Sequence, residues 1–210
     1  MIRDIKMKVC GMRDRNNILD VSQLEPAYMG FIFYPPSPRY VGNDFKVPED
    51  FPETTRRVGV FVNESNDVIL EKVQACRLHF VQLHGNETVA QCRELKSHGL
   101  RIIKAFSVDE NTDFHETDEY GDTVDYFLFD TKGKLYGGNA KTFDWTVLSK
   151  YDQEKPFFLS GGITPEHIED IKRLDDFNLL AIDVNSGVEI HPGFKDVKKI
   201  KAIKAILNSK

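Results

Sequence analysis

The sequence predicts an α/β protein folded as a single (βα)8 TIM barrel with eight parallel strands, and three observations support this. Short apolar runs alternate with amphipathic segments along the chain, which is typical of parallel strands joined by helices. The 210 residues are enough for eight such units in one domain spanning 1–210. No G-x-G-x-x-G run follows an early strand, so a doubly wound open sheet is the less favoured topology.

Eight short apolar runs supply the predicted strands. They are rich in aromatic and β-branched residues and are bounded by glycine, proline or polar residues. Parallel strands need right-handed crossover connections, and the spacing of the runs leaves room for them. The predicted strands are Lys6–Cys10, Met29–Phe33, Arg57–Val62, Phe80–Leu83, Arg101–Phe106, Tyr126–Phe129, Phe157–Leu159 and Leu180–Val184.

Four segments between or after these runs carry apolar residues at helical spacing and are predicted helices. They are Asp67–Cys76, Glu87–His98, Pro165–Leu174 and Asp196–Leu207. Asn86 is expected to cap the second helix, and Thr164 is expected to cap the third, which starts with Pro165. The lysines of the last helix fall mostly opposite its apolar stripe, so we expect them to form a solvated face.

Two other connections are weak helix candidates. The segment after the second strand contains five prolines, among them Pro35, Pro36 and Pro38, and leaves room for only a short helix. The acidic stretch from Asp109 to Asp122 has a poor apolar stripe. We therefore expect these connections to be mostly irregular.

Composition excludes several classes of function. The formal net charge is −5 with no long basic block, which disfavours a nucleic-acid partner. No apolar run approaches the roughly 20 residues that a membrane span needs, and the first residues do not form a secretory signal. We therefore expect a soluble, cytoplasmic protein. The three cysteines show no C-x-x-C spacing, so neither a disulfide framework nor a structural zinc site is indicated.

Asp130 follows the apolar run Tyr126–Phe129 and precedes a glycine- and lysine-rich stretch. In a (βα)8 barrel, the residues that follow the strands form the active site. A carboxyl group at such a strand end would lie half in the core, where burial raises its pKa and makes it a usable proton donor. The alternative is an aspartate that only caps a turn.

Cys10 ends the first predicted strand and is followed by Gly11. A cysteine in a strand is commonly a small buried apolar residue. At the mouth of a barrel, however, a nearby cation could lower the pKa of its thiol and make it a base or a nucleophile. The first and sixth strands lie far apart around the ring, so Cys10 and Asp130 are expected to face each other across the cavity.

Two loops of small residues follow the seventh and eighth strands. They read SGGI from Ser160 and NSGVE from Asn185. Backbone N–H groups in such loops can converge on an anion, and barrels often bind phosphate at this position. A single Gly-Gly pair is usually a turn, but two such loops on adjacent strands predict a phosphate site.

Several segments, in order along nearly the whole chain, resemble the phosphoribosylanthranilate isomerase family. They are KVCGM at Lys8, GFIFYPPSPRYV at Gly30, RVGVFVNES at Arg57, VQLHGNE at Val81, FDT at Phe129 followed by GGNAKTFDW, LSGGITPE at Leu159, and DVNSGVE with PG at Asp183. The resemblance implies a (βα)8 barrel that isomerises N-(5-phosphoribosyl)anthranilate in tryptophan biosynthesis. It implies a phosphorylated small-molecule substrate and neither a metal nor an organic cofactor.

The resemblance also implies roles for individual residues. Cys10 would be the general base, Asp130 the general acid, and Arg39 would bind the anthranilate carboxylate. The backbone around Gly161, Gly162, Ser186 and Gly187 would hold the phosphate. His84 and Asp183 are expected to point toward the mouth of the barrel. His84 would touch the substrate or fix its own loop, and Asp183 would orient sugar hydroxyls.

Two residues depart from the family pattern: Ala140 replaces a usual glycine, and Asn185 replaces a commoner serine. Neither change removes a proposed catalytic group, and Asn185 keeps a polar side chain beside the phosphate loop. Two alternative functions stay open. One is a different sugar-phosphate isomerase, including a relative acting on a histidine-pathway aminoaldose, although such enzymes usually need a pair of carboxylates. The other is a non-catalytic phosphate-binding module. Both a monomer and a homodimer are compatible with the sequence.

Overall fold

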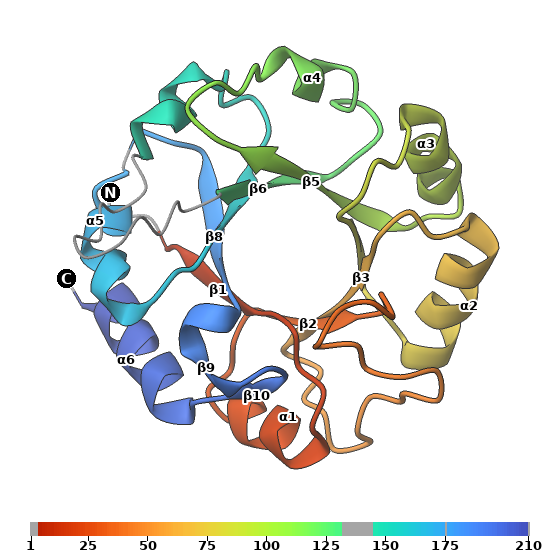
Figure 1. The fold of residues 1–210 in the computed structure, drawn as a ribbon, viewed down its shortest axis with the longest axis vertical. Helices are drawn as coiled ribbons and strands as arrows, with labels where there is room; N and C mark the ends of the chain where they lie inside the picture. The colour runs from red at the N-terminus through yellow and green to blue at the C-terminus, as the bar shows by residue number, and fades with distance from the viewer. Residues whose placement is uncertain (1–3, 132–144, 175, 210) are drawn as a thin grey trace.

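Eight parallel strands form a closed barrel in a computed structural model that describes residues 4–131, 145–174 and 176–209. Each strand pairs with the next, and the last pairs with the first, as the central ring in Figure 1 shows. The predicted fold is confirmed, and the predicted strand ends are correct to within two residues. The strands are β1 (Lys6–Val9), β2 (Tyr28–Ile32), β3 (Arg56–Phe61), β4 (Phe80–Leu83), β5 (Arg101–Val108), β6 (Tyr126–Thr131), β7 (Phe157–Ser160) and β8 (Leu179–Val184).

Helices lie around the outside of the ring (Figure 1). They are α1 (Arg15–Ser22), α2 (Asn66–Cys76), α3 (Val89–Ser97), α4 (His115–Asp118), α5 (Ile168–Lys172) and α6 (Val197–Asn208), with 3-10 turns η1 (Trp145–Lys150), η2 (Pro165–His167) and η3 (Ser186–Val188). A short antiparallel hairpin of β9 (Glu189–His191) and β10 (Phe194–Lys195) precedes α6. Neither α1 nor this hairpin was predicted. No helix in the described part of the chain is long and apolar enough to cross a membrane.

Of the two predicted helix caps, Asn86 is wrong, and the helix start at Thr164 is confirmed. Asn86 does not cap α3, because the helix begins at Val89 and the Thr88 hydroxyl accepts from the Gln91 N–H at 3.2 Å. The region of Thr164 is a helix start as predicted, and the Thr164 N–H donates to the His167 ring at 3.1 Å. There the chain first makes the turn η2 and then α5, which ends at Lys172.

The two weak connections form little helix. The chain between β2 and β3, which the structure describes throughout, contains turns and no helix, because its prolines break the backbone ladder. The acidic stretch forms only the four-residue α4. In α6, Ile200 and Ile203 are fully buried, and each contributes about 1.5–3 kcal/mol by leaving water.

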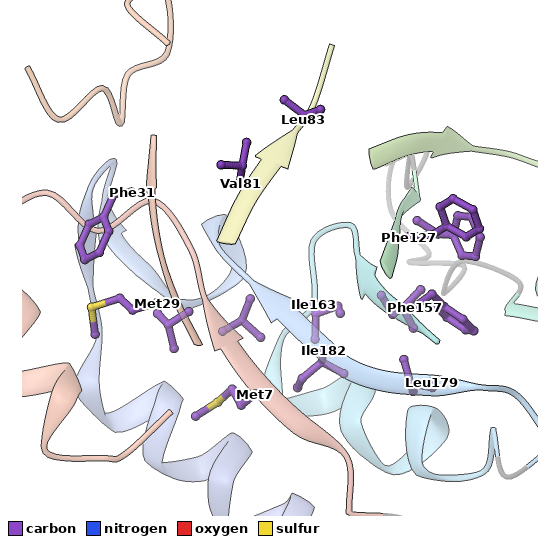
Figure 2. Close-up of a cluster of buried hydrophobic side chains, with 14 of the residues drawn as sticks. Met7, Met29, Phe31, Val81, Leu83, Phe127, Phe157, Ile163, Leu179 and Ile182 are labelled. Atoms are coloured by element: carbon purple, nitrogen blue, oxygen red, sulfur yellow. The ribbon is translucent and has the colours of Figure 1, made fainter. Parts of the chain in front are cut away.

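Alternate residues of each strand face two different cores. Figure 2 shows the core between barrel and helices, with Met7, Met29, Val81 and Ile182 among the side chains that fill it. A second core fills the barrel interior and includes Tyr28, Val58, Phe80, Leu128 and Phe158. This interior core closes the barrel below the cavity and confines polar side chains to the carboxyl ends of the strands.

The alternation in strand β1 decides which of its side chains face the barrel interior. Met7 and Val9 join the outer core. Lys8 and Cys10 therefore project inward, where Cys10 packs with Ile32 of β2. Strand β1 and the residue after it thus place the Lys8 ammonium and the Cys10 thiol in the barrel interior.

Candidate active site

A cavity of about 290 Å³ opens at the carboxyl ends of the strands. Its wall includes the predicted site residues Cys10, Arg39, His84, Asp130, Gly161, Gly162, Asp183 and Ser186, and Gly187 adjoins Ser186 in the chain. The predicted thiol and carboxyl groups therefore share one cavity. The volume is close to the lower end of the range for small-molecule sites.

Cys10 lies directly after β1, where its backbone N–H donates to the carbonyl of Val184 at 2.9 Å. Its side chain is almost fully buried, with 4% of its surface exposed. Gly30 of β2 makes room for it, because a Cβ at Gly30 would lie 2.7 Å from the Cys10 sulfur. The glycine that opens the GFIFYPPSPRYV segment thus has a steric role that depends on the packing of β1 against β2.

The ionisation expected for Cys10 is corrected by the structure. Burial raises the pKa of the Cys10 thiol above its usual range, and this outweighs the charges of Lys8 and Lys195, which lower it. The charge of Asp183 raises the pKa further. Cys10 is therefore mainly a neutral thiol near neutral pH, and the predicted fall of its pKa toward working pH is wrong for the protein alone.

This raised pKa predicts how Cys10 reacts with an alkylating reagent in the ligand-free protein. Only the thiolate reacts with iodoacetamide, so the rate should increase about tenfold per pH unit through the neutral range. The rate should reach half its maximum above pH ~8.5, the ordinary value for a cysteine. Quenched labelling at several pH values, followed by peptide mass spectrometry, measures the Cys10 rate separately. A midpoint below pH ~7.5 would contradict the burial argument.

Asp130 occupies the last inward-facing position of β6, and its side chain is 34% exposed. Its Oδ2 lies 3.5 Å from Nε2 of His84, and Nδ1 of His84 lies 2.8 Å from the amide nitrogen of Gln82. Since the Gln82 amide donates, Nδ1 accepts, and the neutral ring carries its proton on Nε2, which faces Asp130. His84 is thus held by Gln82 and directed at the predicted acid. Gln82 was not predicted.

The loop that follows His84 is held by a buried ion pair. The Glu87 carboxylate accepts from the backbone N–H groups of Gly85 at 3.0 Å and Asn63 at 2.9 Å. Lys104 of β5 lies 3.1 Å from the same carboxylate. These contacts explain why Glu87 does not start α3. His84 itself lies in the cavity wall, and the loop after it is held by Glu87, so a substrate contact of His84 stays a prediction.

Asp183 is more enclosed than predicted. Its side chain is 4% exposed, and Oδ2 accepts from the Lys8 ammonium at 2.7 Å. The other oxygen, Oδ1, is buried and has no hydrogen-bond partner among the described residues, and the same holds for the carbonyl oxygen of the Gln82 side chain. Both residues line the cavity. Asp183 therefore lies in the cavity wall, as expected, but it is largely enclosed and already paired with Lys8, with one acceptor oxygen left over.

Arg39 is already paired within the protein. Its Nε and Nη2 donate to the two oxygens of Glu189 at 2.9 and 2.6 Å. Glu189 also accepts from the Lys195 ammonium at 2.7 Å and from the Gly193 N–H at 3.0 Å. Burial raises the pKa of Glu189, but these bonds lower it to about 2 overall. The Arg39 guanidinium is thus oriented by the Glu189 carboxylate of β9. Its remaining nitrogen, Nη1, makes no hydrogen bond to the described residues.

The two small-residue loops lie side by side, because β7 pairs with β8. Gly161 has φ +121°, and a Cβ there would lie 2.1 Å from the Thr131 hydroxyl. A Cβ at Gly187 would lie 2.1 Å from the carbonyl of Ile163. Both glycines are therefore required by close approaches of the chain. They bring the backbone of both loops to the cavity.

Of the two departures from the family pattern, Asn185 lies in the described part of the chain. The Asn185 side chain lines the cavity, and its Oδ1 accepts from the Lys195 ammonium at 2.7 Å. It is therefore partly engaged by the protein. Ala140 lies outside the described residues.

Among the described residues, no group of three or more His, Cys, Asp or Glu side chains could hold a metal ion. The cavity instead combines a thiol, a carboxyl group, an imidazole and a guanidinium with two glycine-containing loops. A barrel with such groups at the carboxyl ends of its strands defines a (βα)8-barrel enzyme. A family model described as N-(5'phosphoribosyl)anthranilate (PRA) isomerase matches residues 7–205. The chain belongs to the N-(5'-phosphoribosyl)anthranilate isomerase family.

Similar proteins cover almost the whole chain. The N-(5'-phosphoribosyl)anthranilate isomerase of Parabacteroides distasonis is 44% identical over 198 residues, which are 93% of this chain and 90% of the relative. That of Phocaeicola vulgatus is 46% identical over 190 residues, which are 90% of this chain and 91% of the relative. The crystal structure of the Thermotoga maritima phosphoribosyl anthranilate isomerase superposes with a TM-score of 0.82 at 36% identity, covering 97% of this chain and 98% of that one.

Proposed function

We propose that this protein isomerises N-(5'-phosphoribosyl)anthranilate to 1-(2-carboxyphenylamino)-1-deoxyribulose 5-phosphate in tryptophan biosynthesis. A crystal structure of phosphoribosyl anthranilate isomerase holds reduced 1-(o-carboxyphenylamino)-1-deoxyribulose 5-phosphate. It is 31% identical to this chain, with a TM-score of 0.79, and covers 97% of this chain and 98% of that one. The observation that carries the proposal is that Cys10 and Asp130 line one cavity.

Asp130 acts first, as a general acid. It donates its proton to the ring oxygen of the furanose, and the bond between that oxygen and the anomeric carbon breaks. The electron pair on the aryl nitrogen then forms a protonated Schiff base with the anomeric carbon. Since Asp130 is partly exposed at the cavity wall, its proton can be replaced from water after the step.

Cys10 acts second, as a general base. The Schiff base acidifies the neighbouring sugar carbon, and the Cys10 thiolate takes the proton from it. The electron pair of the broken C–H bond moves to the Schiff base and neutralises its nitrogen, which gives an enolamine that tautomerises to the ketose product. Each positioned group should contribute about 10²- to 10⁴-fold to the rate. The reaction needs Asp130 protonated and Cys10 ionised.

The remaining groups orient the substrate. The loops containing Gly161, Gly162, Ser186 and Gly187 bind the phosphate through backbone N–H groups. Oδ1 of Asp183, which has no hydrogen-bond partner in the described part of the chain, takes a sugar hydroxyl, and His84 lies beside Asp130 near the ring. Binding at both ends converts the proton transfers into intramolecular steps. No step uses a metal or an organic cofactor.

Arg39 binds the anthranilate carboxylate in this proposal, and Arg39→Ala should therefore raise KM by about tenfold or more and change kcat much less. The interaction between Arg39 and the carboxylate stabilises the bound substrate and the transition state equally. Steady-state kinetics of the variant measure both constants. Arg39→Lys keeps the positive charge but loses the planar guanidinium that Glu189 orients, so its KM should fall between those of the wild type and Arg39→Ala. An unchanged KM in Arg39→Ala would count against this contact.

The direct test of the function is the fluorescence of freshly made N-(5'-phosphoribosyl)anthranilate. The substrate is fluorescent and decays slowly in buffer, so the purified protein should greatly accelerate the loss of signal. Cys10→Ala serves as the control for contaminating activity. Decay at the buffer rate with folded wild-type protein would overturn the proposal. A single-domain enzyme in the cytoplasm, as monomer or homodimer, remains the accompanying prediction.

A further inference from the structure

Lys8 is a buried cation that the mechanism above does not use. Its side chain is 0% exposed, and its ammonium lies 2.7 Å from Oδ2 of Asp183. The register between β1 and β8 places Lys8 directly opposite Asp183. Cys10 follows two residues later on the same inward face of the chain. A cation, a carboxylate and the predicted base therefore share one buried space.

The other side of Cys10 is apolar. Its side chain packs with Ile32 of β2 and Val60 of β3, and Tyr34 packs against this cluster. A thiolate in this position loses much of its hydration, and an unpaired buried charge is strongly unfavourable. The reaction can populate the thiolate only if a nearby positive charge compensates it.

Four charged side chains act on Cys10. They are Lys8 of β1, Asp183 of β8, Lys195 of β10, and Arg39 from the connection after β2. Lys195 and Arg39 each form an ion pair with the Glu189 carboxylate. The nitrogen–oxygen distances are 2.7 Å for Lys195 and 2.6 Å for Arg39. Among the charges that lower the pKa of Cys10, that of Lys8 has the largest effect.

Lys8 itself stays charged. Burial alone would lower its pKa, but the charges of Asp183 and Cys10 raise it above the usual value. Burial likewise raises the pKa of Asp183, and Lys8 opposes that effect. The ammonium is therefore a permanent positive charge, held in place by Asp183, which itself lines the cavity.

We propose that Lys8 is a positioning residue whose buried ammonium balances the negative charge of the Cys10 thiolate during the isomerisation. Lys8 transfers no proton. Cys10 releases its proton to water, takes one from the substrate carbon, and Lys8 remains an ammonium throughout. Asp183 holds that ammonium beside β1. This inference rests on the proposed function, because it assigns Lys8 a part in the base step.

The test measures the pH dependence of Cys10 alkylation by iodoacetamide in ligand-free protein. Lys8→Met removes the charge and keeps most of the stem, so the midpoint should rise by about one pH unit or more. At a pH below the midpoint, the Cys10 rate should therefore fall about tenfold. Lys8→Arg keeps the charge and should restore most of the wild-type midpoint. Peptide mass spectrometry separates Cys10 from Cys76 and Cys92.

Lys104→Met is the matched control. Lys104 is also a buried lysine paired with a buried carboxylate, Glu87 at 3.1 Å. It is not among the charges that affect Cys10. This variant should leave the Cys10 midpoint within a few tenths of a pH unit of the wild type. An equal shift in Lys104→Met and Lys8→Met would mean that loss of any buried lysine loosens the barrel, and would overturn the proposal.

A double variant covers the case in which Lys8→Met does not fold, since that change leaves Asp183 buried without its partner. Lys8→Met/Asp183→Asn removes both charges together. If Lys8 stabilises the thiolate directly, the midpoint should still exceed that of the wild type, because the effect of Lys8 on Cys10 outweighs that of Asp183. If Lys8 only neutralises Asp183, the midpoint should equal or fall below the wild-type value, and the proposal is wrong.

Activity measurements separate this inference from the proposed function. In folded Lys8→Met, kcat/KM at neutral pH should fall by the same factor as the thiolate fraction, about tenfold or more, and Lys8→Arg should recover most of it. Failure of the wild type to isomerise the substrate would reject the function, whatever the alkylation shows. Normal wild-type turnover with an unshifted Cys10 midpoint in Lys8→Met would reject the role of Lys8 alone.

Discussion

Replacing Cys10 with alanine should lower kcat by about 10²- to 10⁴-fold and leave the barrel folded. The sulfur is the proposed base, and no other thiol lies on the wall of the cavity described by the structure. The substitution removes a single buried atom from a small apolar cluster with Ile32 and Val60, so the cost in stability should be modest. The loss of fluorescence of the phosphorylated substrate measures the rate, and circular dichroism checks the fold.

Cys10→Ser is the informative companion to this variant. A hydroxyl has almost the size of the thiol but does not ionise at any working pH, so it should be nearly as inactive as the alanine. Equal losses in both variants would show that charge formation at this position matters more than packing. Near-normal turnover in either variant would remove Cys10 from the base role, whatever the rest of the cavity does.

Replacing Asp130 with asparagine should likewise lower kcat by about 10²- to 10⁴-fold. The amide keeps the shape and can accept from the Nε2 proton of His84, but it cannot donate an acidic proton to the ring oxygen. Asp130 is partly exposed and has no buried cation as partner among the described residues, so folding should be almost unaffected. Steady-state kinetics and thermal melting test both statements.

His84 is the side chain that could compete for the role of Asp130, since its Nε2 lies 3.5 Å from the carboxylate. His84→Gln should have a smaller effect than Asp130→Asn, because His84 is expected only to orient the carboxyl group and the substrate. The reverse order, with an active Asp130→Asn and an inactive His84→Gln, would reassign the acid to the imidazole.

The fold was predictable because it follows from local patterns. The alternation of apolar runs and amphipathic segments identified all eight strands, and the residues after them identified Cys10, Asp130 and the two glycine loops. Local patterns were less reliable at the ends of helices. Asn86 looked like a cap for α3, but Glu87 is turned back to the Gly85 backbone and Thr88 takes the cap position. A capping pattern does not show which side chain the tertiary structure uses elsewhere.

The charge pairs of the site could not be predicted in this way. Lys8 and Asp183 are 175 positions apart, and Arg39 and Glu189 are 150 positions apart. No local periodicity links such residues, and pairing needs the closed ring that brings β8 beside β1. A lysine within the KVCGM segment was visible, but its burial was not.

The amino-acid sequence was sufficient for the class of fold, for the edge of the barrel at which the cavity opens, and for the thiol and carboxyl groups that line it. These follow from the period of the side chains and from residue types at strand ends, which are local properties. The ionisation of those groups was a different matter: the neutral Cys10 thiol, the carboxylate that orients Arg39 and the buried ammonium of Lys8 depend on closure of the barrel. Burial and charge act through space, so they exist only once distant segments are packed together.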